Sequence, residues 1–338
     1  MAQEKAYGTL PAEAACPGTP VHEQVAPIKT TADDARKNYD RLACIYDCWS
    51  CWERPYLRAG LASLNPQPGE KCLEIGCGTG SLLPALAERV TRRGEVVAVD
   101  ISSKMLKRAE SRLARKRRSH NLAPVHFVCA DVGAPQGLRG TGHGDPGTYD
   151  AAIATFVLEL FPVEVTKSVL AEVRRLLKPT GRLCVVAMSA VNPNKHSWGM
   201  GDGSYPVSKR PQKTCATRFY ELCHRWFPKT VDCRPIYCAA TLAAAGFCVE
   251  PVLDRATQAS VKIARTEWHQ TPYGTQLLPM YGLNVEVICC CKRGDVDGGG
   301  GEPPHQKTLP RVGTMEVKEW AAGENGAAAD DDKAVART

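Results

Sequence analysis

The chain has 338 residues, 43% of them hydrophobic, which predicts one large domain with extensions, or two domains, around a sizeable core. Its formal net charge of +7 is modest. The sequence contains no apolar run of the ~18 residues that a membrane span requires, and its start lacks the apolar core of a signal peptide. We therefore expect a cytoplasmic protein without a transmembrane segment, with import into an organelle left open.

Positive charge gathers in residues 104–118, a helix-like stretch in which Glu110 is the only acid. We interpret this stretch as a solvated outer helix face; attraction to anionic lipid, as a peripheral membrane contact, or to nucleic acid is the alternative. The 16 cysteines include one C-x-x-C pair, Cys48 and Cys51, but neither a second pair nor a histidine pair stands at zinc spacing from it. The sequence therefore predicts no metal site.

Residues 1–32 are rich in Ala, Pro, Gly and Thr and have no sustained periodicity, which is typical of a flexible leader. Residues 32–58 then show a helical, aromatic pattern, in which spacings of three, four and seven place several rings on one helix face. The pattern fits both a helix that covers the core and a helix that lines a pocket.

Residues 71–83, KCLEIGCGTGSLL, predict a buried strand that runs through Gly76, Gly78 and Gly80 into a helix over residues 82–92. Glycines allow a tight turn and a close approach of the backbone to a ligand. The helix N-terminus behind them offers unpaired N–H groups to a carboxylate or phosphate. Dinucleotides and S-adenosylmethionine both use such a turn, but the dinucleotide fingerprint requires glycine where this chain has Ser81.

The following residues alternate between strand and helix patterns, which predicts a parallel sheet with helices on both faces. The expected strands are residues 95–99, 125–130, 150–155 and 182–188, and the expected helices between them are 102–118 and 163–177. Ligands of such sheets bind beyond the carboxyl ends of the strands. The residues at these ends are Glu74, Asp100, Asp131 and Thr155.

Each of these acids has an alternative role as a helix N-cap, but four polar residues at successive strand ends favour a ligand site. Asp100 lies 20 residues after Gly80, where a carboxylate can accept hydrogen bonds from both hydroxyls of a ribose. Beyond the fifth strand, residues 189–213 are irregular, residues 247–253 and 284–291 predict two last strands, and residues from 294 onward are low in complexity.

Two motifs carry a resemblance to a known family. Glu74 with the three glycines resembles the E/D-x-G-x-G-x-G motif of class I S-adenosylmethionine-dependent methyltransferases, and FVCADV, residues 127–132, resembles their adenine-binding segment. YDRLACIYD, residues 39–47, and residues 219–236 resemble the ubiquinone/menaquinone-biosynthesis C-methyltransferase group, also called methyltransferase type 11.

The resemblance implies an α/β fold with a seven-stranded, mostly parallel, doubly wound sheet, whose final strand is inserted antiparallel. Residues 1–32 would be a flexible leader, 33–293 the methyltransferase domain and 294–338 a disordered tail. Within the domain, residues 33–66 would form a helical lid, and 189–235 and 256–282 would be insertions on the substrate side.

The resemblance also implies that the cofactor is S-adenosylmethionine. The cofactor-binding residues that it predicts are Glu74, Gly76, Cys77, Gly78, Gly80, Asp100, Ile101, Asp131, Val132, Thr155, Tyr39 and Tyr46. In this prediction Asp100 binds the ribose, Asp131 binds the adenine amino group, and the N–H of Val132 binds a ring nitrogen.

The expected substrate is a small aromatic or lipid-like molecule, with quinone-type C- or O-methylation favoured. Nucleic acid is not expected, because residues 155–159, TFVLE, lack the N/D-P-P-Y/F/W sequence of enzymes that methylate base amines. His224 is the candidate general base, with Glu159 and His196 in reserve, although a structural role fits His224 equally well. Two alternatives stay open: an N-methyltransferase acting on a phospholipid or other amine, and a non-catalytic cofactor-binding protein. The sequence does not predict the oligomeric state.

Overall fold

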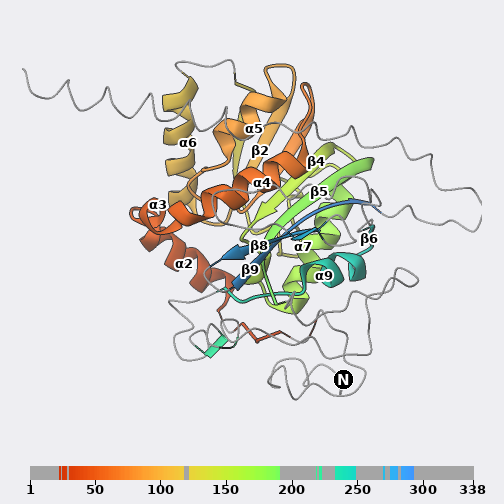
Figure 1. Ribbon diagram of the computed structural model, residues 1–338. Helices are drawn as coiled ribbons and strands as arrows, with labels where there is room; N and C mark the ends of the chain where they lie inside the picture. Colours follow the sequence, from red (N-terminus) through yellow and green to blue (C-terminus); the bar gives the residue numbers. More distant parts are fainter. Residues whose placement is uncertain are drawn as a thin grey trace, which may run out of the picture. The chain divides into compact units, whose positions relative to one another are not determined.

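The structure is a computed structural model, which describes residues 23, 25–28, 30–117, 122–190, 218, 221–222, 233–248, 269–270, 275–280 and 283–292. Within them a single sheet has the strand order β3-β2-β1-β4-β5-β9-β8-β7, and β6 also pairs with β9 (Figure 1). The parallel strands are β1 (Lys71–Ile75), β2 (Glu95–Asp100), β3 (Val125–Cys129), β4 (Tyr149–Thr155) and β5 (Leu177–Ser189). The expected doubly wound α/β fold is confirmed.

The strands beyond β5 pair in antiparallel orientation. β9 (Leu283–Lys292) runs against β5, as expected for the final strand, and β6 (Phe247–Cys248) pairs with its end. The prediction of seven strands was too low, because β8 (Thr275–Met280) and β7 (His269–Gln270) add a further antiparallel pair beside β9. This pair lies at the end of residues 256–282, the stretch interpreted as an insertion.

Helices cover both faces of the sheet because successive residues of each strand point in opposite directions. Cys72 of β1 packs with α4 (Arg54–Leu64), α5 (Leu83–Val90) and α6 (Ser103–Arg117). Leu73 packs on the other face, with α7 (Val163–Leu176) and α9 (Cys238–Ala244). Before α4 the chain forms α2 (Ala32–Leu42), α3 (Tyr46–Trp49) and the short helix η2 (Ser50–Glu53). We call α2 to α4 the lid.

The first part of β5 differs from the expected helix end and turn. Pairing with β4 jumps from Tyr149 opposite Leu177 to Ala151 opposite Arg182, so residues 178–181 bulge out of the strand. α7 therefore ends at Leu176 and leads directly into the sheet. Among the described residues there is no helix with the length and apolar character needed to cross a membrane.

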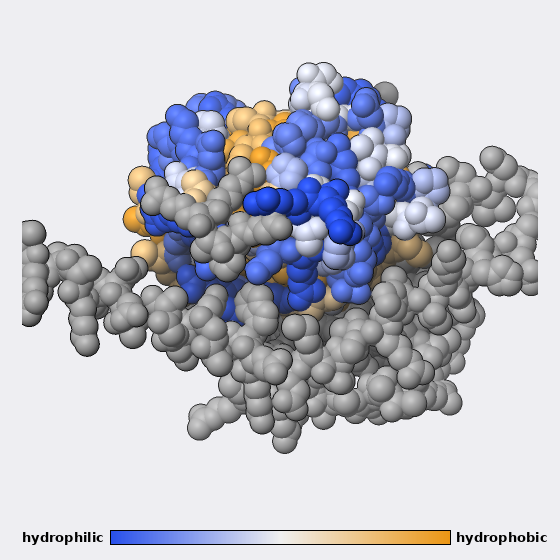
Figure 2. All heavy atoms as spheres, turned by 90° about the horizontal axis from the view of Figure 1, so that it is seen from above, coloured by the Kyte–Doolittle hydropathy of each residue, from blue (hydrophilic) through white to orange (hydrophobic). Residues whose placement is uncertain are grey.

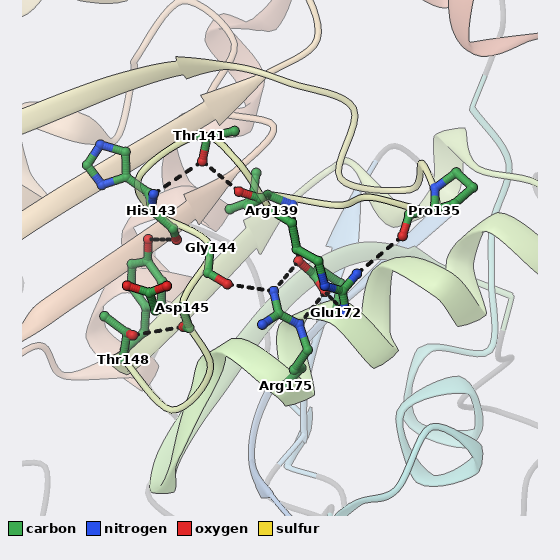
Figure 3. Close-up of polar contacts among 11 residues, drawn as sticks. Pro135, Arg139, Thr141, His143, Gly144, Asp145, Thr148, Glu172 and Arg175 are labelled. Atoms are coloured by element: carbon green, nitrogen blue, oxygen red, sulfur yellow. Dashed lines mark hydrogen bonds and ion pairs between the residues drawn. The ribbon is translucent and has the colours of Figure 1, made fainter.

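The loop between β3 and β4 is held by a cluster of polar contacts with α7 (Figure 3). Glu172 is 7% exposed and accepts hydrogen bonds from the N–H of Leu138 at 3.0 Å and from two guanidinium nitrogens of Arg175, each at 2.7 Å. Arg175 also donates to the carbonyl oxygen of Gly144 at 2.8 Å. These contacts anchor the loop just before β4 begins.

The order of the strands determines where a ligand can bind. The chain moves outward from β1 to β2 and β3 and then returns to β4 on the other side of β1. The carboxyl ends of β1 and β4 therefore flank the point at which the direction of winding reverses, the usual ligand site of an open α/β sheet.

Candidate functional site

The glycine loop after β1 has a left-handed backbone at each of its three glycines. The φ angles are +65° at Gly76, +54° at Gly78 and +74° at Gly80, which strain any other residue. A Cβ on Gly76 would lie 2.5 Å from Val157, and one on Gly80 would lie 2.8 Å from Ala109, so both glycines allow close packing. A Cβ on Gly78 would meet nothing within 4 Å. The backbone at Gly78 thus borders open space, where a ligand can approach it.

Asp100, at the end of β2, fastens this loop to the neighbouring strand. Its carboxylate accepts hydrogen bonds from the N–H of Gly78 and from the N–H of Ser102, both at 2.8 Å. Burial raises the pKa of Asp100, and the two N–H groups oppose that rise. The residue predicted to bind a ribose therefore lies directly beside the glycine loop.

Glu74, in β1, is 1% exposed, and its Oε2 has no hydrogen-bond partner within the part of the chain that the structure describes. Burial, and to a lesser degree the charge of Asp100, raises the pKa of Glu74 to about 8. Buried polar atoms in proteins are almost always paired. A carboxyl oxygen without a partner beside an open glycine loop therefore indicates a site that a ligand completes.

Asp47 of the lid makes a first contact with the glycine loop. Its Oδ1 accepts a hydrogen bond from the hydroxyl of Thr79 at 2.5 Å, and its Oδ2 pairs with Arg112 of α6 at 2.6 Å. Arg112 also donates to the hydroxyl of Ser81 at 2.7 Å. Asp47 and Arg112 together therefore hold both hydroxyl side chains of the loop.

Asp40 makes the second contact of the lid. It accepts hydrogen bonds from the hydroxyl of Ser102 at 2.6 Å and from the N–H of Lys104 at 3.4 Å. We call the contacts of Asp40 and Asp47 the two latches. Tyr39 and Tyr46 were predicted site residues, and their rings meet edge to face at 6.1 Å. The aspartate that follows each of these tyrosines was not predicted. The repetition of the Tyr-Asp pair, seven residues further along the chain, was the signal in the sequence that pointed to these two aspartates.

The lid also meets the end of β4 through three aromatic rings. The ring of Phe156 lies 5.5 Å from that of Trp52 and 6.1 Å from that of Tyr56, and these two lie 6.3 Å apart. Phe156 has a φ of +52°, which is costly for a bulky residue and is found mostly at functional sites. Phe156 of this aromatic trio follows directly after Thr155, the predicted site residue at the end of β4.

Two carboxyl groups stand near the trio. Glu53, next to Trp52, has its pKa raised to about 8, first by burial and second by the charge of Glu159. Glu159, in the short helix η3 (Leu158–Leu160), is 1% exposed and accepts a hydrogen bond from the N–H of Met188 at 3.2 Å. Glu159 was a predicted site residue, as a reserve general base, whereas Glu53 was not predicted.

The remaining predicted cofactor residues lie at the same edge of the sheet. The carboxylate of Asp131 accepts a hydrogen bond from the N–H of Gly133 at 2.9 Å, so it shapes its own turn, and Val132 beside it is buried. The carbonyl oxygen of Ile101 accepts a weak contact from the thiol of Cys129 at 3.7 Å. Cys77 is buried and donates its N–H to the carbonyl oxygen of Val99.

His224 and His196 lie outside the described residues. Cys48 and Cys51 are both exposed thiols, and the described ranges contain no group of three or more His, Cys, Asp or Glu able to hold a metal ion. A cavity of about 280 Å³ lies away from the predicted site, between α7 and α9, and is bordered by the buried Arg234. None of the predicted site residues that the structure describes lines this cavity, so the candidate site is built on the glycine loop and its neighbours.

Comparison with known proteins agrees with this geometry. The methyltransferase domain family matches residues 73–183, which include the glycine loop, Asp100, Asp131 and Thr155. The chain is 32% identical over 183 residues to nocamycin O-methyltransferase of Saccharothrix syringae, covering 53% of this chain and 60% of that protein. It is 34% identical over 131 residues to a ubiquinone/menaquinone biosynthesis C-methyltransferase of Paraburkholderia phymatum, covering 39% and 48%.

A third relative is 2-phytyl-1,4-naphtoquinone methyltransferase of Trichormus variabilis, 26% identical over 159 residues, which cover 46% of this chain and 64% of that one. The chain thus spans about half to two thirds of the length of these three relatives. Residues 73–183 contain the glycine loop and the carboxyl ends of β1 to β4. This part of the chain is thus similar to a methyltransferase domain.

Proposed function

We propose that this protein transfers the methyl group of S-adenosylmethionine to a small aromatic or lipid-like acceptor, with C- or O-methylation of a quinone-type ring as the favoured reaction. The observation that carries the proposal is the open backbone at Gly78 beside the incompletely paired Glu74 and the carboxylate of Asp100. The names of two relatives, both quinone methyltransferases, support the class of acceptor.

The residues at the strand ends fit this cofactor. Asp100 uses one lone pair of each oxygen on the N–H groups of Gly78 and Ser102, and carboxylate oxygens retain further acceptor capacity for a ribose. In this proposal Asp131 and Val132 contact the adenine, and Glu74 and the glycine loop face the methionine end. When bound, the cofactor supplies an electrophilic methyl group on its sulfonium.

The chain itself would position the acceptor and exclude water, which accounts for much of the rate of such a reaction. In our proposal the aromatic trio forms one wall of the acceptor site, and Tyr39 and Tyr46 lie nearer the cofactor. His224 stays our candidate for the base that takes a proton from a ring hydroxyl. Glu159 is a weaker candidate, because one of its oxygens already accepts from the N–H of Met188.

One observation favours a second function, methylation of an amine. Glu53 and Glu159 interact electrostatically beside the aromatic trio, and carboxylates together with ring faces suit a cation. A protonated amine or a phospholipid amine headgroup would favour the ionised form of Glu53, whose pKa burial and Glu159 raise to about 8. This alternative differs from the first in the charge of the acceptor.

A methyl-transfer assay separates the two functions. The protein is incubated with cofactor labelled in its methyl group and, in separate reactions, with a demethylated quinol and with a phospholipid amine. We expect labelled quinol; label in the amine alone would replace the first proposal with the second. Calorimetry with the cofactor is run in parallel. Binding without product from either acceptor or from a metabolite extract would indicate a non-catalytic binding protein.

The role of His224 has its own test. His224→Ala is expected to lose turnover while it keeps the calorimetric affinity for the cofactor, because a general base acts on the acceptor. Near-normal turnover in this variant would contradict the proposed base. Asp100→Ala serves as the control that loses cofactor binding.

A further inference from the structure

A surface of basic and apolar side chains lies on the outside of the lid and α6. Its apolar members are Leu42 and Ile45, which are 41% and 59% exposed. Among the described residues, only Leu222 is another large hydrophobic side chain so exposed. Single exposed hydrophobics are ordinary, but these two lie three residues apart on one side of the lid. We call this region the lid–α6 surface; its basic members are Arg41, Lys104, Lys107 and Arg115.

The two latches determine where Leu42 and Ile45 lie. Asp40 is bonded to Ser102 and Lys104 at the start of α6, and Asp47 is paired with Arg112 further along the same helix. Residues 42–45 stand between these two contacts in the chain. They therefore lie between the two contacts that the lid makes with α6. In Figure 2, orange atoms on the left rim, where Figure 1 places α2 and α3, adjoin blue atoms.

Asp40 of the lid interacts with Lys104, but in the described part of the chain the other basic side chains of this surface have no acid paired with them. Within the described residues, Arg41, Lys107 and Arg115 are exposed and form no ion pair, and Glu110 is the only acid of α6. By contrast, Arg36 and Lys37 of α2 both pair with Asp33 and are left out of the surface. Unpaired basic side chains around exposed apolar ones are typical of proteins that lie on an anionic bilayer.

We propose that the lid–α6 surface docks on an anionic membrane, with Leu42 and Ile45 inserted at the level of the lipid headgroups and the basic side chains over the phosphates. The apolar pair distinguishes a membrane from a nucleic acid, since a phosphate backbone attracts the same cations but offers nothing to exposed aliphatic side chains. This surface is separate from the aromatic trio and from the glycine loop, so the proposal does not depend on which acceptor is methylated.

Docking at this surface would bring the membrane close to the predicted cofactor site. The latches that border Leu42 and Ile45 also hold Thr79 and Ser102, beside the predicted cofactor site. A bilayer at this surface would therefore lie next to the lid. A lipid-dissolved molecule would then have only a short path to the site.

Vesicle sedimentation with the full chain tests the proposal. The vesicles are phosphatidylcholine alone, or phosphatidylcholine with about 30% phosphatidylglycerol, a content that gives a strongly negative surface. We expect binding to the anionic vesicles only, weakening as salt rises. Lys104→Gln with Lys107→Gln should weaken partitioning roughly 30-fold, because each lysine near such a surface contributes several-fold. Leu42→Ser with Ile45→Ser should weaken it by about tenfold or more.

A matched control removes the same charge elsewhere. Arg92→Gln with Arg93→Gln deletes two exposed cations from the turn just before β2, outside the lid–α6 surface, and should change partitioning less than about twofold. Thermal unfolding of every variant checks that the fold is kept. Equal losses in the control and the lysine variant, or no binding to anionic vesicles at low salt, would overturn the proposal. So would binding to single-stranded RNA, by the same side chains, in the absence of vesicle binding.

Discussion

Glu172 and Glu74 are both buried glutamates, 7% and 1% exposed, yet their surroundings treat them in opposite ways. Burial raises the pKa of Glu172, but hydrogen bonds from Arg175 and from the N–H of Leu138 outweigh it and leave that pKa below its usual value. No cation of the described chain compensates Glu74, and burial holds its pKa at about 8.

We interpret Glu172 as a carboxylate that stabilises the fold and Glu74 as a carboxylate of the proposed cofactor site. Glu172 holds the loop before β4 and is complete within the protein. Glu74 lies at the carboxyl edge with one oxygen unpartnered. Perturbed and incompletely paired groups of the second kind mark functional sites.

The largest expected effect is on stability. Glu172→Ala should lower the free energy of unfolding by about 3 kcal/mol, because it removes three hydrogen bonds and leaves Arg175 without its acid. Urea denaturation measures this loss. Glu164→Ala, which removes an exposed partner of Lys167 on the same helix, should stay within about 0.5 kcal/mol. Similar losses in both variants would show that Glu172 stabilises the fold no more than an exposed glutamate does.

Asp100→Ala should mainly weaken cofactor binding. We expect its dissociation constant for S-adenosylmethionine to rise roughly 10- to 100-fold, since charged hydrogen bonds to the ribose are lost. Isothermal titration gives the value, and Asp145→Ala, an exposed acid of the β3–β4 loop, is the control. An unchanged constant would count against the whole site assignment.

Glu74→Gln should change how stability depends on pH. The pKa of Glu74 is raised in the folded state, so the folded protein holds a proton that the unfolded chain releases between about pH 4.5 and 8. Its contribution to stability is therefore present at low pH and is lost as pH rises to about 8, by up to about 1.4 kcal/mol per pH unit. The glutamine variant should show a flatter profile in urea unfolding across this range. Parallel profiles would show that Glu74 is ionised when folded.

The smallest expected effect concerns the lid. Asp47→Ala removes one latch, worth about 1 kcal/mol, and should speed dissociation of the cofactor about fivefold. Stopped-flow displacement by S-adenosylhomocysteine measures the rate. Asp33→Ala changes only ion pairs within α2 and should leave the rate as it is. Equal rates in all three proteins would mean that the latches do not hold the lid during exchange.

Local patterns predicted most of the sheet. The β-branched run that ends in Asp100 and the strand that ends in Thr155 both appear where expected, because buried parallel strands leave an unbroken apolar pattern. The β7–β8 pair was missed, since residues 256–282 carry no clear alternation. The bulge at residues 178–181 was taken for a turn, because glycine and proline suit both.

The candidate site was predictable only in part. Glycine spacing and strand ends pointed to Gly78, Glu74 and Asp100, whose backbone and carboxyl groups the fold brings together. The latches of Asp40 and Asp47 join segments 62 and 32 residues apart, so the repeated Tyr-Asp pair marked the two acids but not the distant hydroxyls that they bind.

In our proposal, where Glu74 faces the cofactor, cofactor binding exchanges the proton on Glu74 for the positive charge of the cofactor. Before the cofactor binds, the carboxyl is neutral near pH 7, because burial holds its pKa at about 8. A cation that arrives beside it lowers that pKa, and the proton leaves for the buffer. The net charge of the site would then stay nearly constant as the cofactor binds. We expect cofactor affinity to rise with pH up to about 8 and the heat of binding to depend on the ionisation enthalpy of the buffer.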